Sequence, residues 1–424
     1  MGGLIFAAPS SGSGKTTVTL GFLRAASRGG ARIISGKSGP DYIDPRFHAA
    51  ASGAACVNLD AWAMSPQRLR TIAQHAPDQT ILIEGAMGLF DGAPPHGKGS
   101  SADLAAALNI PVVLIIDCGR MAGSVAAILR GFTSHDNRIN IAGVILNNVG
   151  SPRHDAMLRD AIAPLGVRIY GAVPRDIGLA HPSRHLGLQQ ASERADLQDF
   201  LNHAADVMDA HLDIAGLLAL ASAHPVAQGT AKPMMPPAQN IAVAHDLAFG
   251  FSYPHMLHDW KDAGAQITLF SPLADDPVPD ADFIFLPGGY PELHAGRLAQ
   301  NDIFTQSLRK ASQTSDIYGE CGGYMVLGDT LTDADGTVHT MAGLLRLDTS
   351  FAARKLHLGY RDITAAQGVM AGTWKAHEFH YATTVSARGT PLFNAADATG
   401  QALPAMGLIN GRVAGSFAHI IDAA

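Results

Sequence analysis

The chain has 424 residues, 47% of them hydrophobic and 16% charged, so it is long enough for two or three domains with separate cores. A net charge of −7 and a pI near 6.2 exclude a broad basic surface, so we expect no nucleic acid among its partners. No uninterrupted apolar run reaches the roughly 18 residues of a membrane span, and we expect no membrane association. The three cysteines lack metal-ligand spacing and are odd in number, which favours a reducing cytoplasm over a disulfide framework.

The first half of the chain alternates short apolar runs with helix-length segments. Strands are predicted at 4–8, 32–35, 80–85, 111–117, 141–149 and 167–173, and helices include 17–28 and 124–132. Strands that are apolar on both faces and separated by helices are typical of a parallel sheet covered on both sides. We therefore predict a doubly wound α/β domain over residues 1–220.

Between the first predicted strand and helix lies SSGSGKTT, residues 10–17, whose small residues allow backbone N–H groups to converge on phosphate oxygens. Lys15 is expected to reach the β and γ phosphates of ATP, and Thr16 to hold Mg²⁺. Pro9 stands where this motif normally begins with Gly. Ser10 stands where partitioning ATPases carry a second lysine, which favours ligase chemistry over a polymer-forming or cargo ATPase. The predicted phosphate-binding residues are Ser11, Gly12, Ser13, Gly14, Lys15, Thr16 and Thr17.

Acidic residues follow the predicted strands of this half. Glu84 ends the apolar run TILIE, Asp91 lies in GLFDG, and Asp41 and Asp44 lie in GPDYIDP. Because parallel strands end at one edge of a sheet, Glu84 is expected beside the phosphate loop, where a metal-bridging or water-holding carboxylate is needed.

The periodic pattern stops at 221–239, which carries four prolines and is predicted to be an interdomain linker. A second α/β domain is predicted over 240–424. Its expected strands are 241–244, 267–270, 283–286 and 317–319.

Cys321 lies between glycines directly after the last of these strands, the elbow arrangement that exposes a nucleophile on a sharp turn. The Gly322 amide is then available to bind an oxyanion, and Gly288 and Gly289 in FIFLPGGY are expected to complete the hole. The elbow, the glycines of the oxyanion hole and a histidine late in the chain all favour a nucleophilic role for Cys321. Cys56 and Cys118 lack these features and are interpreted as small buried hydrophobic residues.

The predicted base is His419, which follows a strand-like run near the C-terminus. His377 and His380 in HEFHY are rival candidates. Their spacing within a probable strand indicates neither a metal site nor a route to the thiol.

Seven stretches occur in a fixed order over essentially the whole chain: SSGSGKTTVTLG, GPDYIDP, IEGAMGLFDG, FIFLPGGYPELHA, YGECGGYMVLG, HEFHY and GSFAHI. With these motifs the chain resembles the cobyrinic acid a,c-diamide synthases, glutamine-dependent amidotransferases of corrin biosynthesis. The resemblance implies a P-loop, dethiobiotin-synthetase-like doubly wound sheet followed by a class I glutamine amidotransferase-like α/β domain.

The resemblance also implies roles for particular residues. Cys321 and His419 would hydrolyse glutamine, and ATP with Mg²⁺ would activate a corrin acetate carboxylate as an acyl phosphate that ammonia displaces. Asp41, Glu84 and Asp91 would be the catalytic carboxylates, with Thr16, Asp41 and Glu84 linked to the metal. Tyr42 and Ile43 would adjoin the corrinoid substrate.

Class I amidotransferases usually carry Glu two residues after the histidine, but this chain has Ile421 there, and Asp422 follows. A Cys-His dyad is therefore expected, with an imidazole that is less well fixed and a slow or substrate-gated glutaminase.

Three alternatives stay open at this point. The substrate is the metal-free hydrogenobyrinic acid or cobyrinic acid, and the AAPSSGSGKTT form of the loop favours the late-cobalt route. A second alternative is that the chain amidates another tetrapyrrole such as nickel-sirohydrochlorin. A third is that it is a non-catalytic P-loop regulatory protein. Whether the chain forms a homodimer is also left open.

Overall fold

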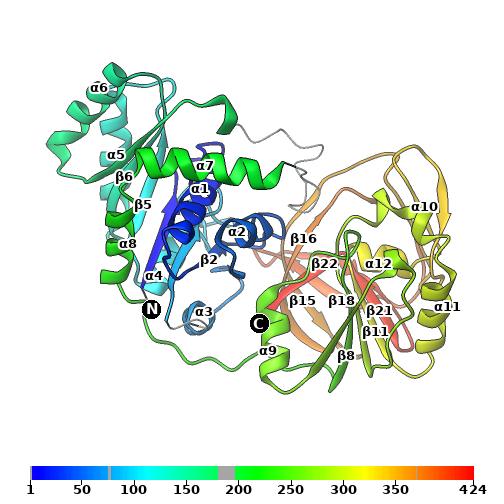
Figure 1. Cartoon of the computed structure of the whole chain (residues 1–424). Helices are drawn as coiled ribbons and strands as arrows, with labels where there is room; N and C mark the ends of the chain where they lie inside the picture. Colours follow the sequence, from blue (N-terminus) through cyan, green and yellow to red (C-terminus); the bar gives the residue numbers. More distant parts are fainter. Residues whose placement is uncertain (1, 75–77, 180–195, 369) are drawn as a thin grey trace. The chain divides into compact units, whose positions relative to one another are not determined.

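The computed structural model describes residues 2–74, 78–179, 196–368 and 370–424. The chain divides into two compact units, Met1–Lys232 and Pro233–Ala424 (Figure 1). The stretch predicted as a linker spans this division, but its first residues belong to helix α8 (Ile214–Ala223). Among the described residues, no helix combines the length and apolar character needed to cross a membrane.

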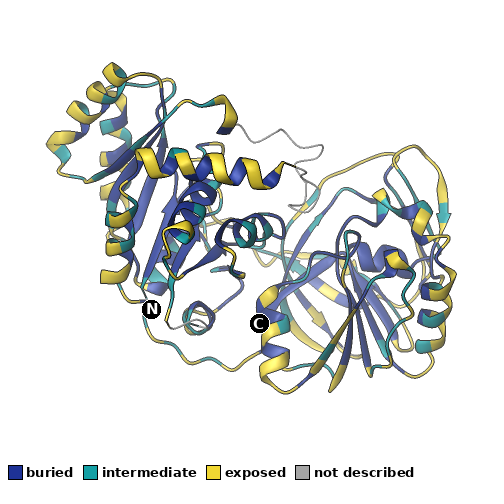
Figure 2. Cartoon of the chain, in the orientation of Figure 1, coloured by how far each residue is buried: buried dark blue, intermediate teal, exposed yellow. Residues whose placement is uncertain are grey.

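The first unit is built on a seven-stranded parallel sheet with the strand order β3-β2-β4-β1-β5-β6-β7. Its strands are β1 (Gly3–Ala7), β2 (Ile33–Ser38), β3 (Cys56–Leu59), β4 (Thr80–Glu84), β5 (Val112–Asp117), β6 (Ile141–Val149) and β7 (Ile169–Pro174). Strands β1, β4 and β5 form the buried centre of the sheet (Figure 2). The predicted doubly wound domain is confirmed. The sequence pattern missed β3 and ended β2 three residues early.

Helices cover both faces of this sheet. The chain steps from β1 to β3 in one direction and from β3 to β7 in the other, and right-handed crossovers then place α1 and α2 opposite α3, α4, α5 and α6. Helices α7 and α8 pack against α1. The helices are α1 (Lys15–Arg28), α2 (Asp44–Ser52), α3 (Pro66–Ala73), α4 (Ser101–Leu108), α5 (Ser124–His135), α6 (Pro152–Ile162) and α7 (Leu197–His211), with short 3₁₀ turns η1 (Ala163–Leu165) and η2 (Ile177–Leu179).

The second unit contains a six-stranded sheet with the order β20-β21-β11-β10-β8-β9, parallel except for the β20–β21 pair. Its strands are β8 (Asn240–Ala244), β9 (Gln266–Phe270), β10 (Phe283–Leu286), β11 (Asp316–Glu320), β20 (Leu408–Asn410) and β21 (Val413–Ser416). The four strands predicted for this unit correspond to β8, β9, β10 and β11. The helices are α9 (Pro254–Asp262), α10 (Ala295–Leu298), α11 (Asp302–Ala311) and α12 (Gly322–Leu327), with the turns η5 (Pro272–Ala274) and η6 (Pro291–Leu293).

Two smaller sheets complete the second unit, in the orders β13-β12-β14-β17 and β19-β18-β15-β16-β22. Their strands are β12 (Thr330–Thr332), β13 (Val338–Thr340), β14 (Leu347–Ser350), β15 (His357–Ala365), β16 (Gly372–His380), β17 (Thr383–Ala387), β18 (Phe393–Asp397), β19 (Ala402–Met406) and β22 (Ala418–Ala423). Strand β22 follows β21 after a single residue, so the chain leaves the parallel sheet and enters an antiparallel one. This switch brings residues 418–423 next to β16.

Helix α12 packs closely onto the end of β10, because a Cβ at Gly323 would lie 1.9 Å from the carbonyl oxygen of Leu286. By contrast, Gly131 in α5 is exposed and faces open space. We expect Gly323→Ala to lower the free energy of unfolding by about 1–3 kcal/mol through overpacking. Gly131→Ala should raise it by roughly 0.5–1 kcal/mol through helix propensity. Denaturant unfolding of the two variants measures both changes, and equal effects would contradict this packing.

Candidate functional site

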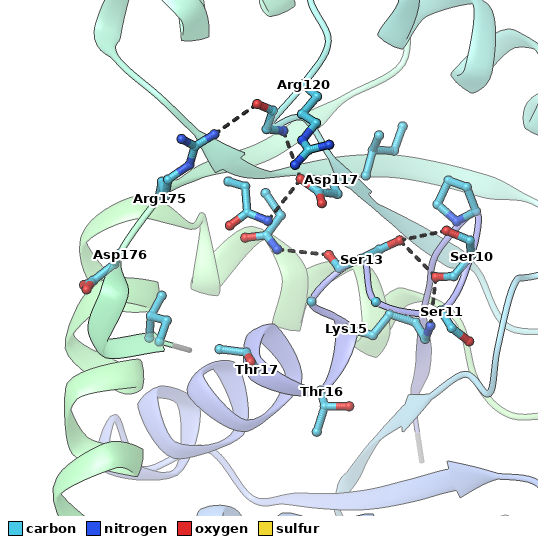
Figure 3. A pocket seen from close by; sticks show the side chains of 18 of the residues that line it. Ser10, Ser11, Ser13, Lys15, Thr16, Thr17, Asp117, Arg120, Arg175 and Asp176 are labelled. Carbon is cyan, nitrogen blue, oxygen red and sulfur yellow. Dashed lines mark hydrogen bonds between the residues drawn. The ribbon is translucent and has the colours of Figure 1, made fainter. Parts of the chain in front are cut away.

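The first unit carries an open pocket of about 1620 Å³ at the carboxyl ends of β1, β5, β6 and β7 (Figure 3). The loop between β1 and α1 forms one wall, and all seven predicted phosphate-binding residues line the pocket. Gly12 and Gly14 have φ angles of 79° and 86°, a left-handed conformation that favours glycine. Asn147 supports the loop by donating from Nδ2 to the Ser13 carbonyl at 2.9 Å. The loop and its position at the start of a helix suit a phosphate group.

Lys15 and Thr16, the first two residues of α1, hold the base of this loop. The Nζ of Lys15 donates to the Met87 carbonyl at 2.6 Å and to the Ser10 carbonyl at 3.4 Å. Burial lowers the pKa of Lys15. Thr16 donates from its hydroxyl to Oε1 of Glu84 at 2.6 Å, which links the loop to the end of β4.

Glu84 is the centre of a buried charge cluster. Its Oε1 also lies 3.0 Å from Nζ of Lys37, and its Oε2 lies 2.7 Å from Nε2 of His48. Lys37 in turn lies 2.7 Å from Oδ2 of Asp44. Burial alone would raise the pKa of Glu84, but Lys37 and His48 hold it well below the usual range. The carboxylate is therefore fully ionised and pairs with two cations in the interior.

The two cations of the cluster are stabilised by their neighbours. Burial alone would lower the pKa of Lys37, but Asp44 and Glu84 hold it above its usual range. Burial would likewise lower the pKa of His48, but Cys56 and Glu84 raise it to about 10. His48 is therefore an imidazolium at neutral pH, and Cys56, predicted as a buried hydrophobic residue, lies 3.6 Å from its Nδ1.

Asp41 lies at the rim of the same cluster. Its Oδ2 is 4.0 Å from Nζ of Lys37, and its Oδ1 accepts the backbone N–H groups of Ile43 and Asp44 at 2.8 and 3.0 Å. Burial and the neighbouring Asp44 raise the pKa of Asp41 to about 6. Asp41 is thus the acidic residue of the rim that changes charge near neutral pH.

The other predicted residues of this half lie around the cluster. Asp91 is exposed, its Oδ2 accepts the Gly88 N–H at 2.9 Å, and its charge acts on Lys15. The side chains of Tyr42 and Ile43 are buried, with 7% and 6% exposure. Contact of these two residues with a substrate stays a prediction.

Sequence reasoning missed Lys37, His48 and Asn147. Lys37 lies in a strand that was predicted to end at residue 35, and His48 lies in the unpredicted helix α2. A lysine between small residues directly before GPDYIDP was the available signal for Lys37. No local pattern indicates that His48 contacts Glu84, because 36 residues separate them. Arg120, Asp117 and Arg175 also line the pocket and were not predicted (Figure 3).

In the second unit, Cys321 lies on the sharp turn between β11 and α12. Its φ of 45° and ψ of −100° are rare for a residue with a side chain, and this strain is the signature of a nucleophile elbow. The Cys321 N–H donates to the Ser416 carbonyl at 2.8 Å, which holds the turn against β21. Cys321 is 5% exposed, and its Sγ lies 4.0 Å from the Phe379 carbonyl oxygen.

The three predicted oxyanion residues and His419 converge on Cys321. A Cβ at Gly288 would lie 2.3 Å from Cε1 and 3.2 Å from Nε2 of His419, and 3.3 Å from the Cβ of Cys321. A Cβ at Gly322 would lie 3.0 Å from the Gly289 nitrogen. Glycine at 288 therefore leaves room for the imidazole beside the thiol, and the expected grouping of these residues is what the structure contains.

Acidic groups act on the thiol. Burial, and then the carboxyl group of Glu292, raise the pKa of Cys321 above its usual range. Burial also raises the pKa of Glu292 to about 7. The thiol is therefore neutral until a base removes its proton, which is the role that a neighbouring imidazole can take.

The HEFHY stretch, residues 377–381, begins at the end of β16 and lies beside His419, and its contact with the thiol comes from the Phe379 carbonyl oxygen. His377 pairs with His419 across β16 and β22, and burial together with His419 lowers the pKa of His377 to about 3. Potential ligand atoms of His357, Glu378 and His380 lie within 4.8 Å of one another, a grouping that spacing within one strand did not indicate. The Oε1 of Glu378 contacts His380 at 2.9 Å, and its Oε2 pairs with Arg361 at 2.7 Å. Glu378 is thus held in a pair with His380 and Arg361, and we assign no metal here.

Comparisons with known proteins find a family match for each of the two units. Residues 4–188 match the family described as CobQ/CobB/MinD/ParA nucleotide binding domain, and residues 240–424 match the CobB/CobQ-like glutamine amidotransferase domain. The chain is 51% identical to the hydrogenobyrinate a,c-diamide synthases of Brucella anthropi and Rhizobium meliloti, over 100% of this chain and 99% of each relative. It is 50% identical to that of Rhodobacter capsulatus, over 99% and 98% of the two chains.

Solved structures resemble the chain more weakly. A glutamine amidotransferase covers 42% of this chain and 89% of its own, with 13% identity and a TM-score of 0.31. Chloroplast FtsY from Physcomitrella patens covers 48% and 65%, with 15% identity and a TM-score of 0.33.

Substitution of Glu84 tests the buried cluster. Glu84→Gln leaves Lys37 and His48 without their shared carboxylate, and we expect the free energy of unfolding at pH 7 to fall by about 3–5 kcal/mol. Because the pKa of Glu84 is depressed in the folded protein, its stabilisation should be lost as pH falls toward acid. Denaturant unfolding across pH measures this. The control is Asp206→Asn, which breaks the exposed Arg28–Asp206 pair and should cost less than about 1 kcal/mol. Equal costs for both variants would contradict the cluster.

The charge of Asp41 should lower stability, whereas the charge of Glu84 raises it. Its pKa is raised to about 6 in the folded protein, so its neutral form is favoured and ionisation above pH 6 opposes folding. We expect Asp41→Asn to raise the thermal midpoint at pH 8, and the gain to disappear as pH falls through 6 toward the ordinary value of 3.8. Thermal unfolding at pH 5 and pH 8 decides, and a gain that is the same at both pH values would refute it.

Proposed function

Because this chain belongs to the hydrogenobyrinate a,c-diamide synthase family, we propose that it amidates the a and c acetate carboxylates of hydrogenobyrinic acid in cobalamin biosynthesis. ATP supplies the energy and glutamine the nitrogen. The observation that carries the proposal is the presence, in one chain, of a thiol elbow beside a buried imidazole and a phosphate loop beside buried carboxylates. The full-length relatives are named for the metal-free corrin, which favours hydrogenobyrinic over cobyrinic acid.

The second unit is proposed to release ammonia. His419 takes the thiol proton of Cys321, and the sulfur attacks the side-chain amide carbon of glutamine. The N–H groups of Gly288, Gly289 and Gly322 are suited to stabilise the resulting oxyanion. Collapse breaks the carbon–nitrogen bond, ammonia leaves with the proton from His419, and water hydrolyses the thioester to glutamate.

The first unit is proposed to use ATP to activate the corrin carboxylate. A corrin carboxylate attacks the γ phosphorus, ADP leaves, and ammonia then displaces inorganic phosphate from the acyl phosphate to form the amide. Lys15 and the loop N–H groups stabilise the transferred phosphoryl group. Water competes with ammonia for the acyl phosphate, so a site that excludes water favours amidation.

A divalent cation suits the oxygen atoms at the base of the loop. The hydroxyl group of Thr16 and the carboxylate of Glu84, 2.6 Å apart, are hard oxygen ligands of the kind that Mg²⁺ prefers, and Asp41 lies across Lys37 from them. Mg²⁺ bound there would neutralise charge on the β and γ phosphates. Lys37 already supplies one positive charge to these carboxylates, and we assign it the role of keeping Glu84 ionised and in place.

The corrinoid is proposed to bind near the GPDYIDP loop. Asp41 at the rim is able to accept a proton, and Tyr42 and Ile43 follow it on the same turn. Asp91 occupies the neighbouring loop after β4. The charge of Asp91 acts on Lys15, which is consistent with a position at the edge of the phosphate site.

Two substitutions separate the half-reactions. The full chain is incubated with hydrogenobyrinic acid, ATP, Mg²⁺ and either glutamine or ammonium chloride, and products are identified by mass. Cys321→Ala should abolish glutamine-driven amidation but retain the ammonium-driven reaction, because ammonia no longer has to be released. Lys15→Ala should lose both, by at least roughly 10²-fold, because the charge on the phosphoryl group is no longer stabilised.

Other outcomes would identify a different protein function. If no amide forms with hydrogenobyrinic acid but cobyrinic acid or nickel-sirohydrochlorin is amidated, then that other tetrapyrrole is the substrate. Loss of neither activity in Cys321→Ala would remove the thiol from the reaction. Absence of turnover in the wild type with every substrate would favour a regulatory P-loop protein.

A further inference from the structure

The residue before the nucleophile, Glu320, lies next to the catalytic imidazole. Glu320 is the last residue of β11 and is 2% exposed, and His419 on β22 is 1% exposed. The Oε2 of Glu320 lies 3.6 Å from Nδ1 of His419, a distance within the range of an ion pair and slightly longer than a hydrogen bond.

The carboxylate is also anchored to the strand that carries the histidine. The Oε1 of Glu320 accepts the backbone N–H of Ile420 at 3.0 Å, and Ile420 directly follows His419. One oxygen therefore fixes β22 while the other faces the imidazole. This two-point contact couples the position of the ring to β11, the strand that directly precedes Cys321.

The two ring nitrogens of His419 face different groups. The Nδ1 faces Glu320, whereas the Cε1–Nε2 edge lies against Gly288, beside the Cβ of Cys321. A carboxylate at Nδ1 favours the tautomer that is protonated there, which leaves the Nε2 lone pair for the thiol proton.

The surroundings strengthen this contact. Glu320 borders a cavity of about 140 Å³. Among the described residues that line this cavity, Glu320 alone carries an acidic side chain. The other lining residues include Phe283, Phe285, Trp374 and Ile420. A low dielectric increases the attraction between a carboxylate and an imidazolium, so the ion pair gains strength when His419 takes the thiol proton.

The residues after His419 do not supply this carboxylate. Ile421 has no acid group, and Asp422 pairs in register with Lys375 and accepts the Ala423 N–H at 3.0 Å. We propose that Glu320 is the positioning residue of the glutaminase site, holding Nδ1 of His419 so that Nε2 accepts the proton of Cys321. The carboxylate that class I enzymes place after the histidine comes here from the residue before the cysteine. The inference rests on the proposed glutaminase activity, and it replaces the expectation of an imidazole without an acid.

The test compares Glu320→Gln and Glu320→Asp in the full chain, with Asp259→Asn as the matched control. Asp259 is a buried carboxylate of the same unit that accepts the backbone N–H of Met234 at 2.8 Å. Glutamate release from glutamine is measured under saturating ATP and hydrogenobyrinic acid, and ammonium-driven amidation is measured in parallel.

We expect Glu320→Gln to lower kcat for glutamine hydrolysis by roughly 10²-fold, because the imidazole loses the acid that orients it, with KM little changed. Glu320→Asp should recover part of kcat, and ammonium-driven amidation should remain in both variants. Asp259→Asn should keep the wild-type kcat. A wild-type kcat in Glu320→Gln, or a loss confined to KM, would overturn the proposal.

A second measurement uses the wild-type protein, so it tests the proposal even where a Glu320 variant does not fold. ¹⁵N NMR of imidazole-labelled wild type, with the His419 signals identified by their loss in His419→Asn, reports which nitrogen carries the proton. Protonation at Nδ1 is expected, and a neutral ring protonated at Nε2 would overturn the proposal. This readout needs no turnover, so it separates failure of the Glu320 contact from failure of the proposed function, which would appear as a wild type that releases no glutamate.

Discussion

Parallel strands end at one edge of their sheet, and both candidate sites depend on this constraint. In the first unit the ends of β1, β4, β5 and β6 bring the phosphate loop, Glu84 and Asn147 together. In the second unit the ends of β10, β11 and β21 bring the paired glycines, Cys321 and Ser416 together. Sharp turns are needed at such edges, and glycines occupy positions where a side chain would collide: a Cβ at Gly14 would lie 2.1 Å from Nδ2 of Asn147, and a Cβ at Gly288 would lie 2.3 Å from Cε1 of His419.

Burial has different consequences for the ionisable groups of the two units. Around Glu84, two cations and the neighbouring carboxylates compensate one another, so the group stays ionised despite burial. Around Cys321, burial and nearby carboxylates oppose the thiolate, and the proton is removed only when a base is in position. An ionised first site suits the binding of phosphate and a cation, and a neutral thiol in the second site is a weak nucleophile until a base removes its proton.

The placement of His419 explains how one strand change builds the thiol site. Strand β21 belongs to the parallel sheet and pairs with β11, while β22 begins two residues later in an antiparallel sheet. The imidazole is thereby brought from a different sheet to the edge where the elbow lies. The carboxylate of Glu320 accepts the Ile420 N–H and lies 3.6 Å from Nδ1 of His419, so a single side chain connects the two sheets beside Cys321.

Local patterns in the sequence determined much of this protein. The alternation of apolar runs and helices indicated the doubly wound domain, SSGSGKTT indicated the phosphate loop, and glycines around Cys321 indicated the elbow. Each of these depends on neighbouring residues, whose spacing sets backbone conformation directly. The grouping of His419 with Cys321 was also anticipated, because a histidine late in the chain is a recurrent partner of such a thiol.

Contacts between distant segments were decided only by the tertiary structure. The pairing of His48 and Lys37 with Glu84, the support that Asn147 lends to the loop, and the approach of Glu320 to His419 join residues between 36 and 134 positions apart. Strand order and the crossing between sheets create these contacts, and neither is encoded in any short stretch of residues. The sequence therefore determined which chemical groups are present and on which turns, while packing decided which of them touch and hence which are charged.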